Sequence, residues 1–139
     1  MTEPSTPLFP AQNEYPSLSD RIQSLLIDQV FIVTLMFMFA SILDHFENPP
    51  DWIRAALFFG IWGIYEPFCL SFACTLGNYV KGIRVRKFAN IAAKPNLLQA
   101  YFRYFIKVLL GWLSFLSIST NKERRAIHDL AANTIMVKA

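Results

Sequence analysis

One apolar run constrains this chain more than any other feature of its sequence. It extends over twenty-two residues, from Ile22 to Leu43, and its polar positions are Gln23, Ser24, Asp28, Gln29, Thr34 and Ser41. An α-helix rises about 1.5 Å per residue, so the run reaches about 33 Å, which matches a hydrocarbon core of roughly 30 Å. The run therefore predicts a helix that spans a lipid bilayer.

A second apolar run begins at Trp52 and continues to Cys74. Between the two runs lies DHFENPPD, residues 44–51, which has three acids, two adjacent prolines and no lysine or arginine. This composition is typical of a short polar turn. The second run carries Glu66 and Pro67 past its middle, and it predicts a second spanning helix that Pro67 kinks by removing a backbone donor.

The composition favours a membrane protein of one domain. Of 139 residues, 54% are hydrophobic and 17% are charged, which departs from the average soluble protein. The first seventeen residues contain four prolines and no apolar core, so residues 1–17 predict a disordered tail rather than a secretory signal. Residues 18–139 are then expected to form one membrane domain.

Basic residues gather between Leu76 and Val108. They are Lys81, Arg84, Arg86, Lys87, Lys94, Arg103 and Lys107, and no aspartate or glutamate accompanies them. Under the positive-inside rule this segment is cytoplasmic, which puts the 44–51 turn outside and the N-terminus inside. We therefore expect a multi-pass protein of the cell inner membrane, embedded in the lipid bilayer, with basic side chains against anionic headgroups.

The last apolar stretch, VLLGWLSFLSIS at residues 108–119, is only twelve residues long. As a helix it reaches about 18 Å, which favours a re-entrant hairpin or an interfacial segment. The alternative is a third span from about Tyr101 to Thr120, with Arg103 and Lys107 extending their charged ends to the interface. The predicted fold class is an all-α integral membrane protein with two transmembrane helices plus this re-entrant or third membrane segment.

Two short segments have the composition of β-strands. GIRVRK at residues 82–87 and NTIMVK at residues 133–138 resemble each other and are rich in β-branched side chains. They are suited to pair as a short cytoplasmic β-ribbon, which requires both to lie on the same side of the membrane. This requirement agrees with the re-entrant alternative for residues 108–119.

Three ionisable residues fall where the surroundings are expected to be apolar. Arg21 and Asp28 are seven residues apart, so on a helix they share nearly one face, about 10.5 Å apart along the axis. Glu66 lies at a similar depth if the two helices are antiparallel. Two interpretations stay open. In the first, the two acids and Arg21 or Arg103 form a structural network that holds the helices together. In the second, a carboxylate exchanges a proton for a cation.

Three sequence motifs occur in a defined order along the chain. An Arg-x6-Asp opens the first run, TLGNYVKGIRV follows Glu66, and RRAIHDLAANTIMV lies near the C-terminus. Together they resemble the RDD family of membrane proteins over about residues 18–138. That family is named for one arginine and two aspartates, which match Arg21, Asp28 and Asp129. The supporting positions are Thr75, Gly77, Lys81, Gly82, Arg103 and His128.

Two positions depart from the family pattern. Asn78 stands where the family usually carries lysine, so a phosphate or headgroup role of that lysine is not carried over. Asn133 follows Ala132 where Ala-Gly is common, and asparagine tolerates a left-handed backbone better than most residues, so we expect the turn to persist. Gly77 and Gly82 are expected to permit a tight turn after the second helix.

Asp129 follows His128 in a segment that predicts a short amphipathic helix. It has two candidate partners, which are Arg125 four residues earlier and Arg21 across the cytoplasmic face. We favour Arg21, since the resemblance singles out these residue types together, and the pair would then close the helices over Asp28. His128 is expected to be a structural neighbour rather than a proton carrier.

The resemblance implies that some members act as cation/proton antiporters, so Na⁺ or a proton is the expected cargo. Two spans enclose too little volume for a pathway, so transport requires a homo-oligomer. The alternative is a non-transporting membrane scaffold or partner subunit, in which the charged residues hold the helices together. No nucleophile with an adjacent base stands out, so we expect no enzyme, and the sequence predicts no metal, cofactor or nucleic acid partner.

Overall fold

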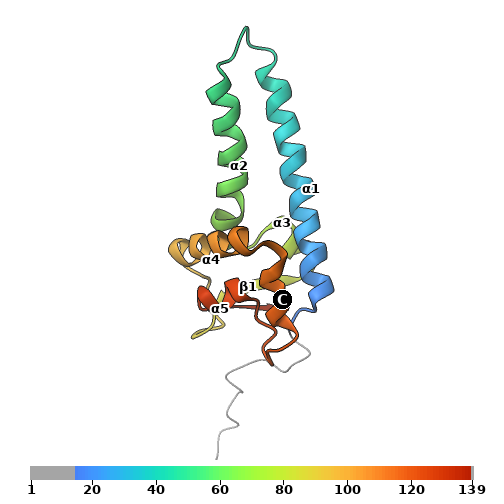
Figure 1. Cartoon of the computed structure of the whole chain (residues 1–139), viewed down its shortest axis with the longest axis vertical. Helices are drawn as coiled ribbons and strands as arrows, with labels where there is room; N and C mark the ends of the chain where they lie inside the picture. Colours follow the sequence, from blue (N-terminus) through green and yellow to red (C-terminus); the bar gives the residue numbers. More distant parts are fainter. Residues whose placement is uncertain (1–14, 139) are drawn as a thin grey trace, which may run out of the picture.

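Two long helices and a group of shorter elements make up the protein in the computed structural model, which describes residues 15–138. Helix α1 covers Leu18–Leu43 and α2 covers Asp51–Phe72, and they stand side by side, joined by a turn at one end (Figure 1). Among the described residues, these are the two helices long and apolar enough to cross a membrane. The two predicted runs are thus confirmed as candidate membrane-spanning helices.

The ends of these helices follow from the local sequence. At the start of α1, the Ser17 hydroxyl accepts a hydrogen bond from the Asp20 amide at 3.2 Å, and the Asp20 carboxylate accepts one from the Ser17 amide at 3.3 Å. This capping box satisfies two backbone donors that the first turn leaves without partners. In the 44–51 turn, Asn48 has a φ of +52° and Pro50 directly precedes α2, so the chain reverses there.

Burial along the α1–α2 hairpin is confined to the end away from the turn. The buried residues of α1 are Arg21, Ser24, Asp28 and Ile32, and those of α2 are Pro67 and Leu70. Toward the turn, large apolar side chains are exposed, with Phe37 at 72% and Phe59 at 65%. Contiguous apolar surface of this kind indicates contact with lipid or with another protein.

The remaining elements form a cap, residues 76–138, below the open end of the hairpin (Figure 1). The cap contains α3 (Leu76–Val80), β1 (Ile83–Lys87), α4 (Leu97–Leu110), the 3₁₀-helix η2 (Gly111–Ile118), α5 (Ile127–Ala131) and β2 (Thr134–Lys138). In Figure 1, α4 runs across the direction of α1 and α2 rather than along it. The cap therefore closes one end of the hairpin and leaves the turn end free.

The two strands of the cap confirm the predicted ribbon. Strands β1 and β2 pair antiparallel, with Ile83 opposite Lys138 and Lys87 opposite Thr134. Gly82 and Asn133, which precede the two strands, have φ values of +64° and +54°. Asn133 thus adopts the left-handed backbone conformation that we expected from the sequence. The buried residues Leu70, Ile83, Val85, Ala100 and Met136 form an apolar core between the ribbon, α2 and α4.

The segment predicted as a re-entrant or third span breaks into two pieces. Helix α4 ends at Leu110, Gly111 has a φ of +55°, and the chain continues as η2. Glycine adopts this backbone conformation without the steric penalty that a side chain would add. A continuous helix through residues 101–120 is therefore not formed, and the alternative of a third span in that form is wrong. Helix α4 instead exposes Leu98 and Phe105, at 82% and 59%.

The folded region begins earlier than the sequence indicated. Tyr15 is only 3% exposed and forms a buried apolar cluster with Ile135 and Val137 of β2. Residues 15–17, which we assigned to the disordered tail, therefore belong to the ordered structure. Residues 1–14 of that predicted tail lie outside the described residues.

Candidate functional site: a buried charged cluster

Asp129 lies at the centre of a group of buried charges where the cap meets the hairpin. Its Oδ2 is 2.8 Å from Nη1 of Arg21, and its Oδ1 is 2.7 Å from Nε of Arg103. The side chains of Asp129, Arg21 and Arg103 are all less than 5% exposed. Since Arg21 comes from α1, Arg103 from α4 and Asp129 from α5, one carboxylate joins three helices.

Helix α2 enters the same group through Glu66. Its Oε1 lies 3.2 Å from Nη1 of Arg103, and its Oε2 lies 2.7 Å from Nζ of Lys107. Each of these two carboxylates therefore contacts two basic groups. We call Arg21, Glu66, Arg103, Lys107 and Asp129 the charged cluster.

In the cap part of the cluster, the pKa values of Asp129 and Arg103 are both shifted in the direction that favours the ionised side chain. Burial alone would raise the pKa of Asp129, but the positive charges of Arg103 and Arg21 outweigh it and hold the pKa well below its usual range. Burial would lower the pKa of Arg103, but Asp129 and Glu66 outweigh it and raise that pKa. Both shifts favour the ionised form, so this ion pair is suited to connect α4 and α5 rather than to exchange protons near neutral pH.

His128 lies beside the ion pair and is 1% exposed. Its Nδ1 is 2.9 Å from the Ser114 hydroxyl, and its Nε2 is 3.3 Å from Nη2 of Arg103. Because guanidinium only donates, Nε2 accepts and the ring proton resides on Nδ1. Burial lowers the pKa of His128 to about 3, so the ring is neutral at physiological pH. His128 is therefore a buried neighbour of the ion pair, and its role as a structural neighbour rather than a proton carrier stays a prediction.

Arg125 supports the cluster from outside. Its Nε donates to the Thr134 carbonyl at 3.0 Å and its Nη2 to the Asp129 carbonyl at 3.3 Å, while its guanidinium stacks over the Phe88 ring, 3.9 Å from the centroid. Arg125 thus contacts the backbone carbonyl of Asp129, whereas Arg21 pairs with its carboxylate. The pairing we favoured between Arg21 and Asp129 is the one that the structure forms.

Asp28 lies near the charged cluster but has a different kind of environment. It is 9% exposed, and its Oδ1 accepts hydrogen bonds from the Gly77 amide at 2.7 Å and from the Tyr65 hydroxyl at 3.0 Å. Within residues 15–138 it makes no salt bridge. Asp28 is therefore held by neutral donors alone.

Gly77 places α3 against α1 at short range. A Cβ at this position would lie 2.0 Å from the carbonyl oxygen of Ser24 and 3.0 Å from Cγ of Asp28. Glycine is thus required for close approach of the backbone to the aspartate, and not for the tight turn that we expected at this position. Gly82, whose φ is positive, does serve a turn.

Polar side chains continue the contact between α1 and α3. The Ser24 hydroxyl donates to Oδ1 of Asn78 at 2.7 Å, and Nζ of Lys81 donates to Oε1 of Gln23 at 2.6 Å. The hydroxyl of Thr75 caps α3 by accepting from the Asn78 amide at 3.3 Å. Asn78 is therefore a buried neutral partner of α1.

A small polar cavity of about 20 Å³ lies between Asp28 and the charged cluster. It is lined by Arg21, Ser24, Leu25, Asp28, Glu66, Thr75, Asn78, Arg103, Lys107, Phe115, His128 and Met136. Arg21 is one of the lining residues, and its Nε is buried and has no hydrogen-bond partner among the described residues. A space of this size holds about one water molecule.

The structure brings together most of the residues that the sequence singled out. Arg21, Glu66, Arg103, His128 and Asp129 converge, and Asp28 lies across the small cavity from them. Sequence reasoning missed the contacts of Lys107 and Tyr65 with the carboxylates. Lys107 follows Arg103 by four residues and so shares its helix face, which is a signal that was available.

These observations define a helical membrane-type protein, in which a buried charged cluster fastens two long apolar helices to a cap. The model of the RDD family matches residues 15–133, which is most of the chain, and the protein belongs to this family. No curated protein and no solved structure matches it.

Proposed function

We propose that this RDD family protein is a multi-pass protein of the inner membrane, with its cap and N-terminus in the cytoplasm. The cap carries all seven basic residues between Leu76 and Val108, whereas the 44–51 turn at the other end has three acids and no lysine or arginine. The positive-inside rule assigns the basic end to the cytoplasm. In this orientation, α4 lies along the cytoplasmic interface with Leu98 and Phe105 toward lipid.

We further propose that the protein moves a cation, Na⁺ or K⁺, in exchange for a proton, and that Asp28 is the exchanging group. The observation that carries this proposal is that Asp28 lacks a basic partner within residues 15–138 and borders the small polar cavity. A carboxylate paired with an arginine already has its charge compensated, whereas Asp28 is contacted by an amide and a hydroxyl, so among the described residues its charge is left without a paired cation.

Transport through two helices requires more than one copy. The two helices of one chain enclose no pathway across the membrane, and their exposed apolar faces are available for contacts between copies. A homo-oligomer would place several Asp28 side chains at one depth. The proposed assembly is therefore a small ring or pair of hairpins, with the cap of each on the cytoplasmic side.

The test is ion-driven proton movement in proteoliposomes of the purified full chain, with a pH-sensitive dye inside. We expect an imposed Na⁺ or K⁺ gradient to move protons with the wild type, and Asp28→Asn to abolish the movement. Asp51→Asn, an acid in the exposed turn, is the control and should retain it. Undiminished exchange by a folded Asp28→Asn protein would reject the proposal.

The second candidate function is a scaffold or partner subunit without transport. It is favoured by the charged cluster, in which both carboxylates are already matched by basic groups and the contacts serve to join helices. A wild type without ion-driven proton movement, together with loss of partner capture in Asp129→Asn, would support it. Neither candidate involves catalysis, and we propose no enzymatic activity.

A further inference from the structure

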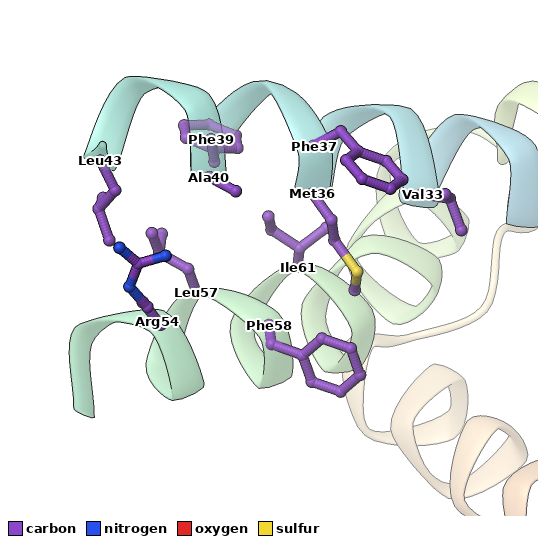
Figure 2. A pocket seen from close by; sticks show the side chains of 10 residues that line it. All are labelled: Val33, Met36, Phe37, Phe39, Ala40, Leu43, Arg54, Leu57, Phe58 and Ile61. Atoms are coloured by element: carbon purple, nitrogen blue, oxygen red, sulfur yellow. The ribbon is translucent and has the colours of Figure 1, made fainter. Parts of the chain in front are cut away.

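A second and larger cavity opens between α1 and α2 near the turn, far from the charged cluster. It has a volume of about 320 Å³ and is lined by Val33, Met36, Phe37, Phe39, Ala40, Leu43, Arg54, Leu57, Phe58 and Ile61. Figure 2 shows Met36, Ala40 and Leu43 of α1 facing Leu57 and Ile61 of α2, with Arg54 at the end near Leu43. We call this cavity the hairpin groove.

The groove requires an apolar occupant. Its lining is apolar apart from Arg54, and water does not fill a space that offers it no polar partners. In a bilayer the surrounding medium is itself hydrocarbon, so a groove that is open to the side admits an acyl chain. The groove is about sixteen times as large as the small polar cavity, at about 320 Å³ against about 20 Å³, which is far more than a side-chain packing defect.

The charges at the end of the groove select among lipid headgroups. Nη2 of Arg54 lies 2.8 Å from Oδ1 of Asp44, and both side chains are about half exposed or more, at 47% and 63%. Arg54 is thus available to a phosphate through its remaining donors. The neighbouring turn adds Glu47 and Asp51, so an additional net negative charge is repelled there, whereas an ammonium group is attracted.

We propose that the hairpin groove binds one acyl chain of a zwitterionic phospholipid with an amine headgroup. The phosphate contacts Arg54, and the ammonium group lies among Asp44, Glu47 and Asp51. The lipid fills the space between α1 and α2 and ties the turn to the membrane surface. This site is independent of the proposed ion exchange, because it lies at the opposite end of the hairpin from Asp28.

The test is photo-crosslinking in nanodiscs of the full chain, followed by mass spectrometry of the labelled residues. Phosphatidylethanolamine with a diazirine in its acyl chain is compared with phosphatidylglycerol that carries the same chain. We expect labelling concentrated on Met36, Leu57 and Ile61, and several-fold stronger with phosphatidylethanolamine. The triple variant Asp44→Asn, Glu47→Gln, Asp51→Asn should remove the difference between the two lipids while labelling of the groove continues.

Substitution of the groove provides a second, matched comparison. Ala40→Trp fills the space and should abolish the concentrated labelling, whereas Val30→Trp, on an exposed face of α1 outside the groove, should leave it unchanged. Both variants are first checked for the same elution and helical content as the wild type. The comparison thus separates occupancy of the groove from the general effect of an added tryptophan.

Three results would overturn the proposal. Equal labelling of the groove and of outward-facing Phe59 would mean that lipid only surrounds the helices. Equal labelling by the two lipids in the wild type would reject the headgroup assignment. Disulfide crosslinking between copies at Ala40→Cys, in a variant with Cys69 and Cys74 replaced by serine, would identify a second copy as the occupant.

Discussion

The two ends of the α1–α2 hairpin are held together in different ways. At the cap end, buried ion pairs through Asp129 and Glu66, and close backbone contact at Gly77, connect α1 and α2 to α3, α4 and α5. At the turn end, the helices enclose an apolar groove, and within residues 15–138 their polar connection there is the exposed pair of Arg54 and Asp44. Specific geometry is therefore concentrated at the cap end, and the turn end is adapted to an apolar partner.

The two ends should also contribute differently to the free energy of unfolding. Removal of one member of a buried ion pair typically costs about 3–5 kcal/mol, because the remaining charge stays buried without a partner. An exposed ion pair typically contributes about 0.2–1 kcal/mol. The same type of substitution should therefore lower the free energy of unfolding several-fold more at the cap end than at the turn end. The following predictions measure that difference.

Asp129→Asn should produce the largest effect. The substitution keeps the shape of the side chain but leaves Arg21 buried without a carboxylate and Arg103 with Glu66 alone, so we expect the free energy of unfolding to fall by about 3–5 kcal/mol. Denaturant titration in detergent micelles, followed by circular dichroism, measures the change. Asp51→Asn, in the exposed turn, is the control. A loss below about 1 kcal/mol would show that the cluster does not hold the cap on the hairpin.

Gly77→Ala should have the next largest effect. The added Cβ would lie 2.0 Å from the Ser24 carbonyl oxygen, so α3 must shift away from α1. We expect a loss of about 1–3 kcal/mol in the free energy of unfolding, as for other overpacked sites. Gly60→Ala is the matched control, because a Cβ there meets nothing within 4 Å. Equal stabilities of the two variants would contradict the close approach of α3 to α1.

His128 predicts a dependence of stability on pH. Its pKa is about 3 in the folded protein, whereas an unfolded histidine has a pKa near 6.5. Between these values the unfolded chain binds the additional proton, so the free energy of unfolding falls as the pH decreases, by about 1.4 kcal/mol per pH unit. Denaturant titrations at several pH values between about 6.5 and 4.5 should give free energies of unfolding that follow this slope. This range lies above the pH at which Asp129 begins to contribute to the dependence of stability on pH.

Two variants separate His128 from the other histidine of the chain. His128→Gln should flatten the dependence on pH, because its side chain does not titrate. His45→Gln, in the exposed turn, should leave the slope as it is in the wild type. A slope that persists in His128→Gln would assign the dependence to another group.

The sequence was sufficient for the features that depend on local pattern. Run length predicted both long helices, and β-branched composition predicted the ribbon of β1 and β2. The Arg21–Asp129 pair was predicted because the residue types of a known motif occur together. The Tyr65–Asp28 contact was missed because it depends on how α2 is rotated against α1. The Lys107–Glu66 contact was missed because the spacing of Lys107 from Arg103 places the two on one helix face but does not show that this face packs against α2.

Arg54→Gln should have the smallest effect on stability. Its guanidinium and the Asp44 carboxylate are largely in contact with solvent, so the pair gains little from Coulomb attraction, and we expect a change within about 1 kcal/mol. The same denaturant titration measures it, and Asp44→Asn should give a similar value because it removes the same pair. If Arg54→Gln instead lowers stability as much as Asp129→Asn does, the turn end is a second anchor of the hairpin. In that case the contrast between the two ends no longer holds.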